Sequence, residues 1–309
     1  MSSQPNIAEQ PIPAGRDGDR ITYGAVHLDV TDLERSLSFW RDVAGLGELP
    51  SLPGEARLGV GGRALVVLHP GATRPAARGH AGLYHLAIHV PDAFEFASSL
   101  VRIGEARVPQ SPTDHIFSKA TYLHDPDGIM LEVTLETPER YRSIEIGPRS
   151  AYIVDSEGQR RGPTEPLDLP AALAPLGDGT PQGRLGSGAY IGHVHLHVPD
   201  LAGANAFYRD VIGFSEHANM AGIGMADLSA GGSFPHRLAV NDWNGPQATQ
   251  PAAGTAGMRH YELILGEPEG LEGLAGRAGA AGVEISVDEG AHAWLRDPAG
   301  NAIDVGAGS

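Results

Sequence analysis

The sequence predicts an α+β protein made of four βαβββ modules. The first observation behind this prediction is a gapless repeat, in which the segment that begins at Tyr23 recurs from Ile191. The second is a fainter echo, in which YHLAIHVPD from Tyr84 resembles RHYELILGE from Arg259. The third is a DPDG or DPAG turn between two short runs, which is typical of a closing β-hairpin. We place the starts of the modules near Ile21, Leu83, Tyr190 and Met258.

The repeat defines the first elements of modules one and three. Its conserved positions recur 168 residues later and are Gly24, Val26, His27, Leu28, Val30, Asp32, Leu33, Phe39, Arg41, Asp42, Val43 and Gly45. Alternating apolar residues predict a first strand. Asp32, or Asp200 in the second copy, is then expected to cap a helix, which ends at a glycine. Two short strands around the DPDG or DPAG turn close modules two and four.

The organisation into domains follows from the repeat. Residues 1–20 are expected to be a flexible tail, and residues 21–136 an N-terminal domain that holds modules one and two. Residues 137–189 are rich in Pro, Gly and charge and contain one weak helical patch, PAALAPL, so we interpret them as a connecting segment. Residues 190–306 form the C-terminal domain, with modules three and four.

Composition excludes several classes of function. The 309 residues include 38 acidic and 22 basic side chains, a net charge of −16 that disfavours nucleic acid and anionic membranes as partners. There is no cysteine, so thiolate metal sites are excluded. No run is long and apolar enough to cross a bilayer, and the first twenty residues lack the apolar core of a signal peptide. We therefore expect a cytoplasmic protein. The sequence leaves its oligomeric state open, and a homo-oligomer is one of the alternatives.

One face of each predicted first strand is unusually rich in imidazole. Side chains alternate across a strand, so Val194, Leu196 and Val198 share one face and three histidines share the other. The same slot holds Ala25, His85, His193 or His260 in the four modules. A carboxylate recurs in the closing strands, as Glu132 and Asp304, where burial is costly unless the group is paired or binds a metal. We interpret the remaining strand histidines as structural or supporting residues: His27, His89, His195 and His197.

The segments GHVHLHVPDLAGANAFYRDVIGF and DPDGIMLEV and the four-module layout resemble the vicinal oxygen chelate superfamily, which includes glyoxalases, bleomycin resistance proteins and extradiol dioxygenases. The nearest resemblance is to the catechol-2,3-dioxygenase-like subgroup. It implies that paired modules curl into two U-shaped barrels. It also implies one metal held by a histidine from the first strand of each paired module and a carboxylate from one last strand.

The pairing of the modules decides which residues complete that set. Modules two and three would supply His85, His193 and Glu132, which is the set we favour. Modules three and four would instead supply His193, His260 and Asp304. Modules one and two would offer only His85 and Glu132, because Ala25 cannot bind a metal.

The resemblance also implies a reaction, in which Fe(II) and O₂ open the ring of catechol or a substituted catechol beside the diol. Within it, His115 would act as general acid and base, Tyr122 would bind substrate and His236 would steady oxygen. Two imidazoles and one carboxylate suit Fe(II), with Mn²⁺, Zn²⁺ or Ni²⁺ as alternatives. Two other functions stay open: a metal-dependent isomerase or lyase of the glyoxalase type, and a non-enzymatic protein that binds aromatic drugs.

Overall fold

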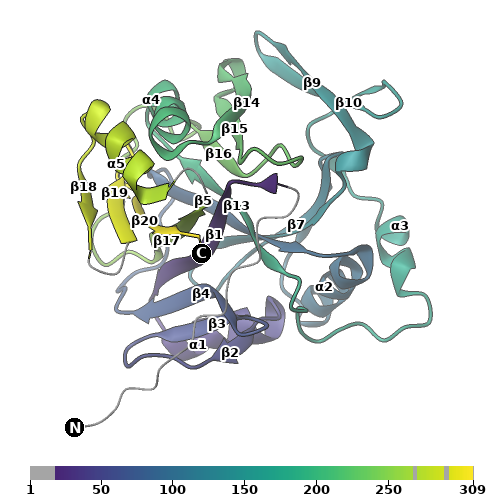
Figure 1. The fold of residues 1–309 in the computed structure, drawn as a ribbon. Helices are drawn as coiled ribbons and strands as arrows, with labels where there is room; N and C mark the ends of the chain where they lie inside the picture. Colours follow the sequence, from purple (N-terminus) through teal and green to yellow (C-terminus); the bar gives the residue numbers. More distant parts are fainter. Residues whose placement is uncertain (1–17, 267–269, 289–291, 309) are drawn as a thin grey trace.

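The computed structural model describes residues 18–266, 270–288 and 292–308. Each module contains a first strand, a helix and three further strands, as predicted (Figure 1). Within the described residues, no helix has both the length and the apolar composition needed to cross a membrane. Modules one and two consist of β1 (Ile21–Val30), α1 (Leu33–Ser38), β2 (Gly47–Leu49), β3 (Ala56–Val60), β4 (Arg63–Pro70), β5 (Gly82–Val90), α2 (Ala93–Glu105), β6 (Ser111–Asp114), β7 (Ser118–His124) and β8 (Met130–Glu136).

Modules three and four repeat this order of elements. α1 and α4 each continue into a wider π-helical turn, formed by Phe39–Val43 and Phe207–Ile212. The elements of modules three and four are β13 (Tyr190–His197), α4 (Leu201–Ala206), β14 (Ser215–Met220), β15 (Met225–Ser229), β16 (Leu238–Asn241), β17 (Gly257–Leu265), α5 (Gly270–Ala280), β18 (Ile285–Val287), β19 (His292–Arg296) and β20 (Ala302–Ala307).

The predicted helix signals are confirmed by local hydrogen bonds. The carboxylate of Asp32 accepts from the backbone N–H of Arg35 at 3.0 Å, and Asp200 accepts from Gly203 at the same distance. These bonds satisfy donors that a helix leaves unpaired in its first turn. The helix of module three ends at Gly213, whose φ of 109° is the left-handed conformation that glycine adopts without strain.

Two large sheets carry the modules, and each sheet joins one module from either half of the chain. Within the described residues, the nine-stranded sheet has the order β12-β6-β7-β8-β5-β13-β16-β15-β14, and the eight-stranded sheet the order β18-β19-β20-β17-β1-β4-β3-β2. Module two therefore pairs with module three through antiparallel β5 and β13, and module one pairs with module four through β1 and β17. The sequence halves 21–136 and 190–306 interleave in both sheets, and their boundaries as folding domains stay predictions.

The apolar faces predicted for the first strands form the core. The side chains that alternate with the histidines on β5 and β13 are buried against the helices, and α2 packs on β5 and β8. This arrangement leaves the histidine-bearing faces of the two paired strands on the opposite side of the sheet. The buried members of these faces include Leu86, Ile88, Val90, Val194, Leu196 and Val198.

The connecting segment has more structure than its composition predicts. It forms a three-stranded sheet and then adds one short strand to the edge of the nine-stranded sheet at β6. The predicted helical patch is α3, which packs beside α2. We call the hairpin of β9 and β10 the arm; it projects from the body of the molecule (Figure 1). The elements of this segment are β9 (Tyr141–Gly147), β10 (Ser150–Asp155), β11 (Arg160–Arg161), β12 (Glu165–Pro166) and α3 (Leu169–Leu173).

The predicted flexible tail, residues 1–20, lies mostly outside the described residues, which begin at Gly18. The last part of that tail is anchored. The Asp19 carboxylate lies 2.7 Å from Nε of Arg237 and both side chains are buried, so ordered packing begins before the predicted boundary at Ile21.

Candidate metal centre

Three buried side chains converge where β5, β13 and β8 lie side by side. Nε2 of His85 lies 2.9 Å from Oε2 of Glu132, and Nε2 of His193 lies 3.1 Å from the same oxygen. The two Nε2 atoms are 3.1 Å apart. The exposed fractions of His85, Glu132 and His193 are 3%, 2% and 1%. Three ligand atoms this close together in a buried site form a candidate metal centre.

The register of the strands produces this convergence. Ala87 lies opposite His193 on the antiparallel neighbour and beside Glu132 on the parallel neighbour. The methyl group of Ala87 leaves room for both larger side chains. His85 stands two residues earlier on β5 and therefore projects from the same face. The pairing of modules two and three thus unites residues that are 108 positions apart, His85 and His193.

A chain of hydrogen bonds orients His193. Nδ1 of His89 lies 2.7 Å from the Glu136 carboxylate, which only accepts, so this nitrogen carries the proton. Nε2 of His89 then accepts from Nδ1 of His193 at 2.9 Å. Glu136 is held in turn by the Tyr190 hydroxyl at 2.6 Å and by Arg237 at 2.5 Å. Such partners fix both the tautomer and the ring orientation of a metal ligand.

The electrostatics hold these three side chains in the protonation states that bind a divalent cation. Burial and the neighbouring His236 hold the pKa of His193 well below its ordinary value, and burial also lowers the pKa of His85 despite the nearby Glu132. Burial alone would raise the pKa of Glu132, but the two imidazoles hold it well below its ordinary value. Two neutral imidazoles and one carboxylate are the forms that bind a divalent cation.

The residues fit a bound metal because lone pairs on their nitrogen and oxygen atoms point toward one another. The chain through His89 places the proton of His193 on Nδ1, so Nε2 presents a lone pair to Glu132 and His85. A cation between these atoms resolves that repulsion. The hydroxyl of Thr134 donates to Oε1 of Glu132 at 2.7 Å and leaves Oε2 toward the imidazoles. Two histidines and one carboxylate with open positions are typical of non-heme Fe(II) sites.

The three residues predicted to take part in the reaction line one cavity with His85 and Glu132. Nε2 of His115 lies 2.8 Å from the Tyr122 hydroxyl, and Tyr122 stands directly opposite Glu132 in the β7–β8 pair. The ring of His236 lies 4.4 Å from that of His193, centroid to centroid, and its Nδ1 lies 2.9 Å from Asp227. These roles stay predictions, although the fold brings all of the side chains together.

The cavity has a volume of about 570 Å³, which is typical of small-molecule sites. Its wall near the ligands is aromatic: the ring of Tyr84 contacts His85, His195 and Trp243 edge-on or tilted. Another part of its wall is apolar and comes from the arm, from β14 and β15 and from the turn between these two strands. That wall contains Ile144, Ile153, Met220, Ile223 and Met225.

Comparisons with known proteins identify the family to which this fold and this group of side chains belong. Residues 22–133 and 190–305 match the model of the Glyoxalase/Bleomycin resistance protein/Dioxygenase superfamily. The chain belongs to this superfamily. It is also 35% identical over 282 residues to a catechol-2,3-dioxygenase of Bacillus subtilis (strain 168), a match that covers 90% of this chain and 94% of that protein.

Solved structures share the fold of this superfamily member. A putative dioxygenase from Bacillus subtilis aligns with a TM-score of 0.61 at 15% identity, over 93% of this chain and 86% of that one. Glyoxalase I from Zea mays aligns with a TM-score of 0.55 at 16% identity, over 93% and 92% of the two chains. Both likenesses concern the fold alone.

The alternative ligand set of this superfamily member is not brought together. β13 pairs with β5 and not with β17, so His193 lies with module two and away from His260. His260 stacks against His27, with ring centroids 3.9 Å apart. Asp304 lies 2.9 Å from Nδ1 of His292. Among the described residues, His193, His260 and Asp304 do not form a group that could hold one ion.

Several residues that contact the candidate site could not be identified from the sequence of this superfamily member. His89 and Glu136 stand four residues after His85 and Glu132 on the same strands, so alternation placed them on the same face, but their mutual contact depends on strand pairing. Asp227, beside His236, carried no recognisable signal. The sequence pattern assigns the arm to a connecting segment, although Ile144 and Ile153 line the cavity.

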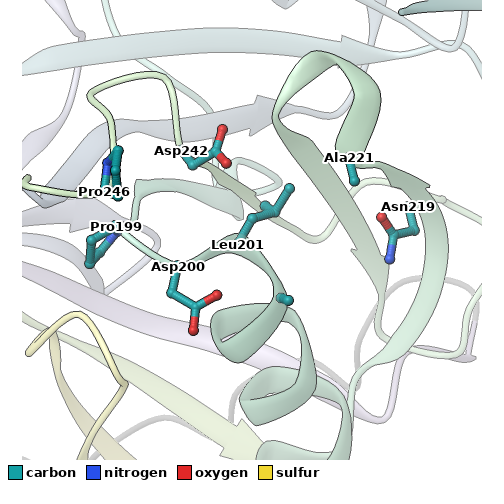
Figure 2. Close-up of a pocket in the computed structure, with 8 residues that line it drawn as sticks. Pro199, Asp200, Leu201, Asn219, Ala221, Asp242 and Pro246 are labelled. Atoms are coloured by element: carbon teal, nitrogen blue, oxygen red, sulfur yellow. The ribbon is translucent and has the colours of Figure 1, made fainter. Parts of the chain in front are cut away.

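A second hollow lies at the start of α4 and is a poorer candidate for chemistry (Figure 2). Its carboxylates are those of Asp200 and Asp242, and Asp200 already caps α4. It contains none of the predicted site residues. Its lining comprises Pro199, Asp200, Leu201, Ala202, Asn219, Ala221, Asp242 and Pro246.

Proposed function

We propose that this protein is an Fe(II)-dependent extradiol dioxygenase that opens the ring of a substituted catechol beside its diol. The observation that carries the proposal is the buried convergence of His85, His193 and Glu132, of which His85 and Glu132 line the cavity. The 35% identity to a protein named catechol-2,3-dioxygenase supports the same reaction class. Bound Fe(II) would supply the redox-active centre for a reaction between a diol and O₂.

His115 is suited to move a proton of the substrate. Its Nδ1 lies 2.7 Å from the carbonyl oxygen of Pro163, which only accepts, so the proton of the neutral ring resides on Nδ1. Nε2 is then the basic nitrogen, and it faces the Tyr122 hydroxyl. We assign His115 the role of general base toward a catechol hydroxyl, with the proton returned to product later.

Tyr122 and His236 are suited to donate hydrogen bonds. Burial and the charge of Glu132 raise the pKa of Tyr122 well above its ordinary value, so it remains a phenol. Burial opposes protonation of His236, but the Asp227 carboxylate outweighs burial and raises the pKa of His236. Nδ1 of His236 donates to Asp227, which leaves Nε2 to present a proton to an oxygen atom of the reactants.

The cavity indicates the class of substrate. No lysine or arginine occurs among its described lining residues, and the apolar part of its wall is built from Ile and Met. A carboxylate-bearing catechol would therefore find no lysine or arginine to pair with, whereas an alkyl or aryl group would bury apolar surface at the Ile and Met side chains. We accordingly propose catechols with a neutral apolar substituent as the preferred substrates.

Purification without oxygen, followed by metal analysis and a ring-cleavage assay, tests this function. We expect stoichiometric iron to support formation of a yellow ring-opened product when an alkylcatechol and air are added. Activity should be lost on oxidation of the iron and restored by ferrous iron with reductant. Alkyl- and arylcatechols should give higher kcat/KM values than a carboxylated catechol.

Absence of product across several substituted catechols, with iron fully loaded, would contradict the dioxygenase proposal. Activity with Zn²⁺, Mn²⁺ or Ni²⁺ in an isomerisation or elimination would then point to a Lewis-acid enzyme of the same fold. Tight binding of an aromatic compound by metal-free protein, without turnover, would point to a binding protein.

A further inference from the structure

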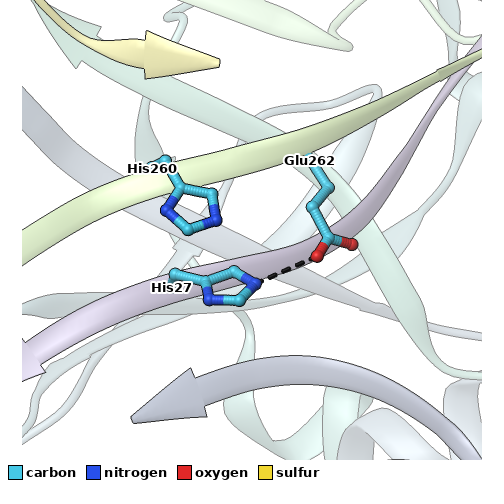
Figure 3. Close-up of side chains that lie close together, drawn as sticks. All are labelled: His27, His260 and Glu262. Carbon is cyan, nitrogen blue, oxygen red and sulfur yellow. Dashed lines mark hydrogen bonds and ion pairs between the residues drawn. The ribbon is translucent and has the colours of Figure 1, made fainter. Parts of the chain in front are cut away.

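A second group of metal-ligating side chains lies on the other large sheet, between β1 and β17. His27 and His260 stand opposite each other on these antiparallel strands, and Glu262 follows two residues after His260 on the same face. Nε2 of His27 lies 3.0 Å from Oε1 of Glu262 (Figure 3). One ligand atom from each of the three residues lies within 4.8 Å of the others. We call this group the outer cluster.

We propose that the outer cluster binds a second divalent transition-metal ion, of the Zn²⁺ or Co²⁺ class, independently of the centre at His85, His193 and Glu132. Two imidazoles and one carboxylate, without a thiolate, form a donor set that suits such ions. The stacked imidazoles of His27 and His260 present their edges side by side, with Glu262 next to them (Figure 3).

The surroundings orient the donors of the outer cluster. The backbone N–H of Ala25 donates to Oε2 of Glu262 at 2.8 Å, which leaves Oε1 toward His27. Nδ1 of His27 lies 2.8 Å from Nε2 of His69, the kind of outer partner that sets the tautomer of a ligand histidine. A Cβ atom on Gly24 would collide with the Glu262 side chain, so a glycine at this position makes room for the carboxylate.

The charge states also suit a cation. Burial and the nearby His27 lower the pKa of His260 to about 3, so its imidazole is neutral. Burial raises the pKa of Glu262, but the hydrogen bonds from His27 and Ala25 outweigh burial and lower it, so the carboxylate is ionised. Unlike the triad, the outer cluster is partly exposed at His260 and Glu262, which gives an ion a route from solvent.

A bound ion would join β1 and β17, whose ligands His27 and Glu262 are 235 positions apart in the chain. Because the site exists only when these strands pair, binding would stabilise the folded state in proportion to the logarithm of metal concentration above the dissociation constant. The melting temperature should therefore rise with added Zn²⁺ even in protein that cannot fill the first centre.

The stoichiometry of metal binding by the full chain tests this proposal. Metal-free protein is titrated with Co²⁺, whose d–d spectrum reports imidazole and carboxylate ligation, and with Zn²⁺ by calorimetry. We expect two ions per wild-type chain, one in His193→Ala, one in His260→Ala and none in the double variant. Glu262→Gln, which keeps a hydrogen-bond acceptor but removes the charge, should weaken the second binding event by more than tenfold.

His80→Ala is the matched control, because His80 lies outside both groups and contacts the backbone of Thr249. It should bind two ions. A single ion in the wild type, or unchanged stoichiometry in His260→Ala, would overturn the proposal. His260 is partly exposed, so its replacement opens no cavity in the core, and a cooperative melt of each variant confirms that it is folded. These readouts do not depend on ring-cleaving activity, so the dioxygenase proposal and this one can fail separately.

Discussion

The β5–β13 and β1–β17 strand pairs are built from the same repeated modules but hold different groups of side chains. In the β5–β13 pair, the large side chain of His193 on β13 lies opposite the small Ala87 on β5. In the β1–β17 pair, the equivalent positions hold the small Ala25 on β1 and the large Glu262 on β17. The large and the small residue have therefore exchanged strands. His85 corresponds to His260 in both pattern and position. The comparison teaches that one exchange across a strand pair adds a carboxylate, Glu262, to the first strand, while the closing strand keeps Asp304.

The two strand pairs also differ in what supports the ligands. In the β5–β13 pair, His193 is held by His89 and Glu136, whose counterparts four positions after His260 and Asp304 are Ile264 and Gly308. In the β1–β17 pair, His69 contacts His27 from β4. The first centre is therefore buried and oriented by a long chain of partners, and the outer cluster is open and has a short one.

The largest effect should come from His193→Ala, which gives β13 the alanine that β1 has at the equivalent position, Ala25. The variant should lose bound iron and lower ring-cleaving turnover by more than about 100-fold, beyond the range common for residues that only support a ligand. Metal analysis and steady-state kinetics check this outcome, with His80→Ala as control. Full retention of iron would remove His193 from the centre.

A smaller loss should follow from His89→Ile, which copies Ile264 into the supporting chain. Nδ1 of His193 would lose its partner, and iron affinity should fall by about 10- to 100-fold. Competition with a chelator gives the affinity, and His89→Gln should recover part of it because an amide can still accept the hydrogen bond. A lower melting temperature with unchanged iron affinity would show that His89 acts only in packing.

A change of about tenfold in specificity should follow from Ile144→Arg in the arm, which has no counterpart over the β1–β17 pair in the described part of the chain. The guanidinium would place a cation at the apolar wall and raise kcat/KM for a carboxylated catechol relative to an alkylcatechol. Ile146→Arg makes the same substitution two residues away, at an exposed position outside the lining. Equal shifts in both variants would argue against a role of the wall in specificity.

The smallest effect concerns the closing turn of module two. Burial raises the pKa of Asp125 to about 6, although the backbone N–H groups of Ile129 and Asp127 oppose the shift. Between its ordinary pKa near 4 and about 6, the folded state binds more protons than the unfolded state, so the free energy of unfolding decreases as pH rises. Asp125→Asn should flatten this slope, as urea unfolding at about pH 4.5 and about pH 6.5 can measure. An unchanged slope would mean that other groups cause it.

The modules themselves were predictable because their signals are local. Alternation, the Asp32 and Asp200 caps and the DPDG and DPAG turns act within a few residues, and all of them reappear in the structure. The pairing of modules two and three was not derivable from spacing. It depends on packing between strands about 100 residues apart and was favoured only through a family resemblance.

The parts that could not be predicted depend on contacts between distant segments. Glu136 acquires its place from His89, Tyr190 and Arg237, which no local pattern connects. Glu262 looked like one more polar residue on a strand face, because the exchange with Ala25 appears only when β1 lies beside β17. The arm had a strand-like alternation around Ile144 and Ile146, but its Pro- and Gly-rich surroundings favoured a linker.

The nested pairing of the modules has a consequence for synthesis of the chain. The inner pair, modules two and three, is complete once residue 241 has been made. β1 can pair with β4 early, but its other edge has no partner until β17 follows at residues 257–265. During that interval the edge of β1 carries unpaired backbone donors and acceptors, which are prone to pair with other chains. The nascent protein should therefore be most vulnerable to aggregation late in translation, after the module pair that carries the candidate metal centre has formed.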